Sequence, residues 1–235
     1  MSDEGPRRLV RPPMRGQEGG RGAPARLKTA KKHTPSSQAW LERQVNDPYA
    51  AEARAKGYRS RAAFKLIEID DRFRLLRKGA RVVDLGCAPG GWVQVALERG
   101  AGAVAGIDLL PVEPIAGAEL LEMDFTEPDA EPRLIAALGG APDLILSDMA
   151  PNTIGHRQTD HLRIMGLIEA AAEFAITQLK PGGAFVTKTF QGGESAEVMA
   201  RLKRAFAQVK HAKPKSSRVD SSEVYWVATG LRQSR

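Results

Sequence analysis

A glycine-rich turn followed by two separate aspartates has the spacing of a nucleoside-binding site. The turn at residues 86–91 interrupts the apolar run at 82–85 and opens a helix with Trp92. Its glycines let a ligand approach the backbone without a Cβ in the way. Asp108 follows about 20 residues later, where a carboxylate can accept hydrogen bonds from ribose hydroxyls, and Asp124 is suitably placed for an adenine amino group. The turn lacks both Gly-x-Gly-x-x-Gly spacing and the Lys-Ser/Thr of a P-loop, which disfavours a pyrophosphate ligand.

Taken alone, each aspartate is more typical of a turn or a helix N-cap. The order of acids along three strand ends after the glycine turn instead resembles the S-adenosylmethionine site of class I methyltransferases. The segment at 147–152 lacks the Asn or Asp, two prolines and aromatic that usually mark amino-group enzymes of this class. Cytosine-C5 enzymes carry a nucleophilic cysteine near this point, whereas Cys87 is far away in sequence and is interpreted as a packing residue. We therefore expect an oxygen acceptor.

Four charged residues are expected to meet at the rim that carries these acids. Asp148 comes at the tip of the apolar run at 144–147, and Lys188 comes at the carboxyl end of a later one. An ammonium group at such a place is costly unless carboxylates pair with it. Glu223 starts the last apolar run, and an antiparallel direction for that strand would bring it to the same rim. Lys65, on an early helix, is within reach.

Short apolar runs alternate with amphipathic segments after residue 80, which predicts an α/β fold. The expected sheet is Rossmann-like and mostly parallel, with an antiparallel last strand and helices on both faces. Strands are predicted at 81–85, 103–107, 120–123, 144–147, 184–187 and 224–228. Helices are predicted at 92–99, 133–138, 162–179 and 196–207. Two earlier helices are predicted, one from Ser37 to about Asn46 and one that Ser60 caps and Gly79 closes.

The first 35 residues are rich in Gly, Pro and Arg and lack hydrophobic periodicity. They predict a disordered tail before a methyltransferase domain at 36–235. Nine Lys or Arg and only three acids lie between Met1 and His33, within a chain whose net charge is +7. Such a tail favours a polyanionic partner through counterion release, and a solubilising tail would have the same composition.

The remaining composition, 42% hydrophobic and 27% charged, is that of an ordinary globular protein. No apolar stretch approaches the roughly 18 residues that cross a bilayer, and the start of the chain does not read as a signal peptide. The single cysteine has no disulfide partner, and four scattered histidines lack metal-ligand spacing. We expect a cytoplasmic monomer that binds neither membranes nor metal.

From about Ser36 to Gly230, the chain resembles the FtsJ/RlmE family of ribosomal RNA ribose 2′-O-methyltransferases. The segments that carry the resemblance lie at 59–66, 84–92, 147–152, 188–192 and 222–225. The resemblance implies that the family's catalytic tetrad falls on Lys65, Asp148, Lys188 and Glu223. It implies that the cofactor S-adenosylmethionine contacts Gly90, Trp92, Asp108, Asp124 and Asp148. The long basic N-terminus departs from the usual short member, and its role stays open.

The resemblance also implies a function in ribosome biogenesis, the methylation of a uridine in large-subunit ribosomal RNA. In our hypothesis Lys188, steered by Asp148 and Glu223, orients the 2′-hydroxyl and takes or relays its proton. Lys65 then positions the acceptor and its phosphate. The alternative is a buried salt-bridge network without a catalytic role. RNA contacts are expected from basic residues near this rim, namely Arg59, Arg61, Arg72, Lys210, Lys213, Lys215 and Arg218.

Three other functions stay open at this point. A ribose methyltransferase of the same architecture could act on transfer RNA or on a messenger cap, because the tetrad specifies the chemistry and not the polymer. A catalytically silent RNA-binding or ribosome-assembly factor could retain the fold. A nicotinamide dehydrogenase is disfavoured by the spacing of the glycine turn.

Overall fold

The computed structural model describes residues 47–151, 155, 157–191, 195–218 and 221–233. Two compact units divide the chain, the first ending at Gly57 and the second beginning at Tyr58. The predicted tail at 1–35 and the predicted helix at 37–46 lie outside the described residues. Within the first unit, the structure shows helix α2 at Pro48–Ala55.

Helix α2 was not predicted, although its start signal is present in the sequence. The side chain of Asp47 accepts hydrogen bonds from the backbone N–H groups of Tyr49 and Ala50, and Pro48 occupies the first turn. An aspartate cap before a proline at the first helical position is a typical helix start.

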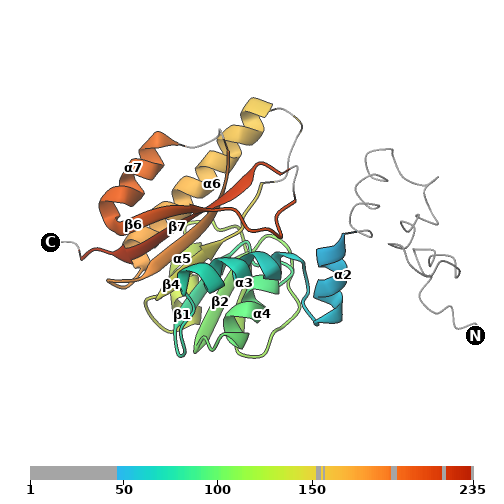
Figure 1. Ribbon diagram of the computed structural model, residues 1–235. Helices are drawn as coiled ribbons and strands as arrows, with labels where there is room; N and C mark the ends of the chain where they lie inside the picture. The colour runs from blue at the N-terminus through green and yellow to red at the C-terminus, as the bar shows by residue number, and fades with distance from the viewer. Residues whose placement is uncertain (1–46, 152–154, 156, 192–194, 219–220, 234–235) are drawn as a thin grey trace, which may run out of the picture. The chain divides into compact units, whose positions relative to one another are not determined.

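The second unit is built on a seven-stranded sheet with helices on both faces (Figure 1). The strand order is β3-β2-β1-β4-β5-β7-β6. The strands are β1 Arg81–Leu85, β2 Ala103–Asp108, β3 Ala118–Glu122, β4 Leu144–Ser147, β5 Ala184–Phe190, β6 Phe206–Ala212 and β7 Glu223–Leu231. Strands β1 to β5 pair in parallel, whereas β7 runs antiparallel to both β5 and β6. The predicted α/β sheet with an antiparallel last strand is confirmed.

Alternating residues of the strands separate the core into two layers. Val83, Leu85 and Ile145 point to the face covered by α5, α6 and α7. Val82 and Val186 point to the face covered by α3 and α4. Such alternation is the period of a β-strand, and both faces are apolar because helices cover both. The helices are α3 Ala62–Phe73, α4 Gly91–Glu98, α5 Ala130–Leu138, α6 Arg157–Gln178 and α7 Ala196–Ala205.

Strand β6 was not predicted. The helix expected at 196–207 ends at Ala205, and the chain continues directly into a strand. Only Phe206 and Ala212, the two ends of β6, are buried, while the residues between them are exposed or half-exposed. An edge strand with this composition has little apolar signal, and its pairing with β7 determines its conformation.

The boundaries of α3 also differ from those expected. Ser60 is not its cap, because the helix begins at Ala62 after Arg61, which makes no side-chain capping bond. The helix ends at Phe73, where Arg74 adopts a left-handed backbone with φ of 55°, well before Gly79. The buried side chain of Asp70 accepts the N–H groups of Leu75 and Leu76, which stabilises this early end.

Candidate active site

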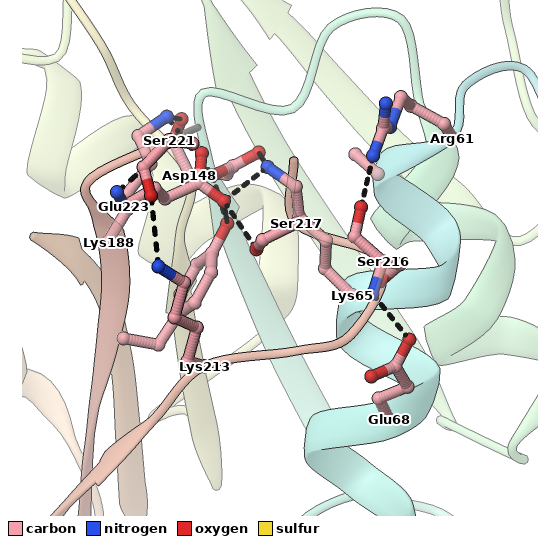
Figure 2. A network of polar contacts seen from close by, with 12 residues as sticks. Arg61, Lys65, Glu68, Asp148, Lys188, Lys213, Ser216, Ser217, Ser221 and Glu223 are labelled. Atoms are coloured by element: carbon pink, nitrogen blue, oxygen red, sulfur yellow. Dashed lines mark hydrogen bonds and ion pairs between the residues drawn. The ribbon is translucent and has the colours of Figure 1, made fainter. Parts of the chain in front are cut away.

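The four charged residues predicted to meet do lie together beside the ends of β4 and β5 (Figure 2). The ammonium of Lys65 lies 2.7 Å from Oε1 of Glu223 and 3.9 Å from Oδ2 of Asp148. The ammonium of Lys188 lies 3.1 Å from Oδ1 of Asp148 and also donates to the Asp148 backbone carbonyl. Two cations and two carboxylates are thus paired in one cluster. All four side chains are largely buried, with exposed fractions between 9% and 18%.

Strand periodicity explains why these residues meet. Lys188 follows Val186 by two positions and Asp148 follows Leu146 by two, so both belong to the face covered by α3. Glu223 precedes Tyr225 by two positions on the same face, and β7 runs antiparallel so that its first residue pairs with the last residue of β5. Lys65 reaches the cluster from α3. The convergence therefore depends on strand register and on the direction of β7.

Tyr225 belongs to this cluster, although sequence analysis did not assign it to the site. Its hydroxyl donates to Oδ1 of Asp148 at 2.8 Å and lies 3.1 Å from Oε1 of Glu223. Its ring is fully buried and packs against Trp92, and the Lys65 ammonium lies 5.8 Å from the ring centroid. The signal that could have identified it is its place two residues after Glu223 on the same strand face.

Electrostatics keep Asp148 ionised and Tyr225 protonated. Burial alone would raise the pKa of Asp148, but the charges of Lys188 and Lys65 and the Tyr225 hydrogen bond outweigh it, so the pKa lies below its usual value. Burial raises the pKa of Tyr225 well above its usual value, and the charges of Asp148 and Glu223 raise it further. Asp148 therefore acts as an anchor for two ammonium groups and one hydroxyl.

Beside this cluster lies a cavity of about 760 Å³ at the carboxyl ends of β1, β2 and β4. Three of the predicted cofactor residues line it, namely Asp108, Asp124 and Asp148. A Cβ added to Gly86 would lie 2.9 Å from backbone and side-chain atoms of Met149, and Gly86 has a φ of 80°. Glycine is thus required at the cavity edge. Other lining residues include Ala88, Ile107, Leu109, Leu110, Phe125 and Arg163.

Two of the aspartates have local partners as well. Oδ2 of Asp108 accepts the N–H of Ala88 at 2.8 Å, and its Oδ1 accepts the N–H of Leu110 at 2.9 Å. Oδ1 of Asp124 accepts both the N–H and the hydroxyl of Thr126. Asp108 thus ties the glycine turn to the end of β2, and both carboxylates are held in fixed positions at the cavity.

Gly90 and Trp92, also predicted to contact the cofactor, are not among the described residues that line the cavity. The indole of Trp92 is buried in the core, and its Nε1 donates to the carbonyl of Ala62 at 2.7 Å. Gly90 has a φ of 110°, and a Cβ there would lie 2.7 Å from Cδ1 of Ile115. The structure gives both residues a packing role, and their contact with a ligand stays a prediction.

The guanidinium of Arg59, a residue predicted to contact RNA, binds three carbonyl groups of the protein, and the RNA contact stays a prediction. It donates to the carbonyls of Pro89, Glu113 and Pro114 at 3.2, 2.6 and 2.9 Å. These bonds join the glycine turn to the loop that follows β2. This geometry assigns Arg59 to the support of the turn.

Asp84 is a buried carboxyl group that sequence analysis left unassigned. It is 1% exposed, and neither of its oxygens has a hydrogen-bond partner among the described residues. Burial raises its pKa well above the usual value, and the charges of Asp148 and Asp108 raise it further. The folded protein therefore keeps this carboxyl protonated at pH values where the unfolded chain has lost the proton.

Asp84→Asn is expected to become more stable relative to wild type as the pH rises. The unfolded carboxyl ionises near pH 3.9, while the folded one stays protonated, so wild-type stability falls by about 1.4 kcal/mol per pH unit between the two pKa values. The Asp84→Asn variant has no ionisable carboxyl at this position, so its stability does not fall in this way. Urea unfolding of ligand-free proteins at about pH 5 and about pH 7 would measure it. Asp143→Asn is the control, because the pKa of Asp143 is lowered and its carboxyl is ionised in both states over this range. A pH-independent difference for Asp84→Asn would contradict the prediction.

Within the described part of the chain, no group of three or more His, Cys, Asp and Glu side chains is arranged to hold a metal ion. None of the described helices combines the length and the apolar character that a membrane span requires.

A Rossmann-like sheet with this strand order, and with a glycine turn and acids at the strand ends, defines a class I methyltransferase. Residues 58–231 match the FtsJ-like methyltransferase family, and the chain belongs to that family.

Relatives and solved structures agree with this assignment. The chain is 68% identical over 224 residues to "Ribosomal RNA large subunit methyltransferase E" of Caulobacter vibrioides, covering 95% of this chain and 99% of that protein. It is 64% identical to the protein of the same name from Acidiphilium cryptum, over 90% of this chain and 94% of that protein. A crystal structure described as a ribosomal RNA methyltransferase from Plasmodium falciparum superposes with a TM-score of 0.66 at 31% identity, covering 75% of this chain and all of that one.

Proposed function

We propose that this protein transfers a methyl group from S-adenosylmethionine to a ribose 2′-hydroxyl, in a uridine of large-subunit ribosomal RNA. The observation that carries the proposal is the double role of Asp148. Asp148 lines the cavity, and its carboxylate also binds Lys188, Lys65 and Tyr225. A methyl donor in the cavity would thus lie next to a cluster suited to managing a proton. The relatives named for large-subunit ribosomal RNA support the choice of substrate.

The cavity fits the chemistry of S-adenosylmethionine. That molecule carries a sulfonium and an ammonium, a ribose with two hydroxyls, and an adenine. The cavity offers the carboxylates of Asp108, Asp124 and Asp148, with apolar surface from Ile107 and Phe125 between them. Asp84, buried and without a hydrogen-bond partner among the described residues, lies close enough for the charges of Asp108 and Asp148 to affect its pKa. Acidic groups at the rim favour a cationic ligand, and carboxylates accept hydrogen bonds from a ribose.

In this proposal the residues of the chain orient the acceptor and remove its proton. S-adenosylmethionine, when bound, supplies an electrophilic methyl group. Lys188, held between the carboxylate and the carbonyl of Asp148, orients the 2′-oxygen. It takes or relays the hydroxyl proton as a neutral amine, after its own ammonium proton has passed to solvent. Lys65, paired with Glu223, positions the acceptor and its adjacent phosphate. Proximity and orientation do much of the work, because a sulfonium methyl is already reactive.

Several of the basic residues expected to contact RNA lie near the cluster. Burial lowers the pKa of the Arg61 guanidinium, and the charge of the nearby Arg218 lowers it further. Arg72, Lys213 and Lys215 line a second cavity, of about 460 Å³, between α3 and the segment after β6. Glu68 and Asp71 line the same cavity, so its charge is mixed, and the excess of one basic residue over the acids favours a phosphate backbone.

We also infer a cytoplasmic monomer that needs neither metal nor membrane and that meets its substrate as the ribosome is assembled. Its residues 1–35 would form a basic tail before a methyltransferase domain at 36–235. The role of the tail is supported by its charge, because nine basic residues and only three acids lie between Met1 and His33. Such a tail would strengthen binding to RNA without reading its sequence.

A methyl-transfer assay tests the proposal. The purified protein is incubated with labelled S-adenosylmethionine and with large ribosomal subunits or transfer RNA from cells that lack it, and the modified nucleotide is then mapped. We expect one labelled uridine carrying a 2′-O-methyl group, and no transfer to RNA with a 2′-deoxyribose at that nucleotide. Label in transfer RNA alone would replace the substrate, label on a base would refute the ribose acceptor, and no label would favour an RNA-binding assembly factor.

A further inference from the structure

The segment after β6, Lys213–Ser217, is called the strap, and α3 holds it from one side (Figure 2). The Glu68 carboxylate accepts the backbone N–H groups of Lys215 and Ser216 at 2.5 and 3.0 Å. The Arg61 guanidinium donates to the backbone carbonyl of Ser216. One carboxylate thus binds two successive amides from a segment almost 150 residues away in sequence. Hydrogen bonds of this kind to a charged group are stronger than those between neutral groups.

The same face of α3 carries both the strap contacts and a member of the tetrad. Arg61, Lys65 and Glu68 are spaced by four and three residues, so they lie on one side of the helix. Arg61 and Glu68 bind the strap, while Lys65 between them binds Glu223. The position of the strap and the position of Lys65 therefore have a common support.

At its other end the strap contacts the tetrad directly. The Ser217 hydroxyl donates to Oε1 of Glu223 at 3.1 Å, and Ser217 is only 6% exposed. The same Oε1 atom lies 2.7 Å from the Lys65 ammonium and 3.1 Å from the Tyr225 hydroxyl. Three groups from three parts of the chain therefore converge on one carboxylate oxygen.

We propose that Glu68 and Ser217 are positioning residues for methyl transfer. Glu68 fixes the strap, the strap brings the Ser217 hydroxyl to Glu223, and the Glu223 carboxylate then holds Lys65 where the acceptor is oriented. Neither residue belongs to the four-residue cluster, so each acts through another residue. The inference rests on the proposed function, because it concerns the same reaction centre.

Two variants remove the two links of this chain of contacts. Ser217→Ala removes the donor to Glu223. Glu68→Gln keeps the shape of Glu68 but presents an NH₂ group in place of one oxygen, so that only one strap amide keeps an acceptor. Each is expected to lower kcat by about tenfold, the effect of losing one well-placed hydrogen bond in the transition state, with both KM values within about twofold of wild type. Both links act in series, so the double variant is expected to be about as slow as the slower single variant.

Controls separate positioning from folding and from charge. Asp71→Asn removes an equal charge from the same helix and the same cavity, but Asp71 pairs with Arg99 and is expected to leave kcat unchanged. Ser217→Thr keeps the hydroxyl and is expected to restore most of the activity. Thermal unfolding of each variant shows whether it is folded. If Glu68→Gln does not fold, the comparison of Ser217→Ala with Ser217→Thr still decides the role of the strap.

The experiment is a steady-state assay of all these variants and wild type with large ribosomal subunits and S-adenosylmethionine. If the losses of kcat in the two single variants add up in the double variant, Glu68 and Ser217 act independently, and the proposed series of contacts is wrong. A raised KM for RNA with unchanged kcat would overturn the positioning role and identify the strap as an RNA-binding surface. If wild type and all variants are fully active, this inference is wrong and the proposed function stands. If wild type itself is inactive, the proposed function is wrong, and this inference is wrong with it.

Discussion

Lys188→Ala is expected to lower methyl transfer by about a thousandfold, the middle of the range for loss of a group that moves a proton. The affinity for S-adenosylmethionine should stay within about threefold of wild type, because Lys188 is not among the described residues that line the cavity. The reason is geometric. The Lys188 side chain is 9% exposed and its ammonium lies 3.1 Å from Oδ1 of Asp148, so Asp148 holds this amine beside the cavity, and alanine supplies no group that can move the proton in its place.

Single-turnover assays and calorimetric titration of the cofactor would measure the two quantities. The matched control is Lys180→Ala, which breaks a similar lysine–aspartate pair of 2.8 Å with Asp143 beside the opposite, amino-terminal end of β4. That variant is expected to keep wild-type activity. Transfer by Lys188→Ala near the wild-type rate would show that the cluster is a structural salt-bridge network.

Asp148→Asn is expected to reduce methyl transfer by about a hundredfold or more and also to destabilise the protein by about 3 kcal/mol near neutral pH. The carboxylate pairs with two largely buried ammonium groups, and asparagine leaves both without this counterion. Because Asp148 also lines the cavity, cofactor affinity should fall as well, in contrast to Lys188→Ala.

The pH dependence of this loss of stability has a definite sign. The pKa of Asp148 lies below its usual value, so its stabilising effect is present above about pH 3.9, the pKa of the unfolded carboxyl, and is lost as the pH falls through the folded pKa. The difference between wild type and Asp148→Asn should therefore shrink in acid. Urea unfolding at neutral and acidic pH measures it.

Two further variants provide reference values for the losses of stability and activity in Asp148→Asn. Asp143→Asn, at a pair that is more than a third exposed, is expected to cost less than about 1 kcal/mol. Tyr225→Phe removes the hydroxyl contacts with Asp148 and Glu223 but keeps the Asp148 carboxylate, and it should reduce activity less than Asp148→Asn does. A neutral effect of Asp148→Asn on both stability and cofactor binding would remove Asp148 from the centre of the site.

Residues near the ends of strands could be assigned to the site from the sequence. Asp108 and Asp148 each end or directly follow a buried apolar run, and parallel strands bring their carboxyl ends to one edge. Lys188 could be assigned in the same way, since it lies within β5 two residues before that strand ends. Glu223 needed one additional assumption, the antiparallel direction of β7, and the register of β7 with β5 confirms it.

Residues whose role comes from a distant partner could not be assigned in this way. In the sequence, Glu68 is an ordinary acid on a helix surface and Ser217 is an ordinary loop serine. Their roles become visible only in the contacts between the strap, α3 and Glu223. The support that Arg59 gives to the glycine turn also became visible only when its guanidinium was found on three carbonyl groups, while its contact with RNA stays a prediction. Strand β6 carries almost no apolar pattern because it lies at the sheet edge, where pairing with β7 decides its conformation.

The sequence by itself therefore determined the α/β class, the glycine turn, and the strand ends that carry Asp108, Asp148 and Lys188. These features depend on local periodicity and on the short reach of turns, which neighbouring residues encode. Only the tertiary structure decided that Tyr225, Ser217 and Glu68 support the cluster. Their contacts join segments up to about 150 residues apart, and such contacts exist only after the sheet has set its register and α3 has packed on one face.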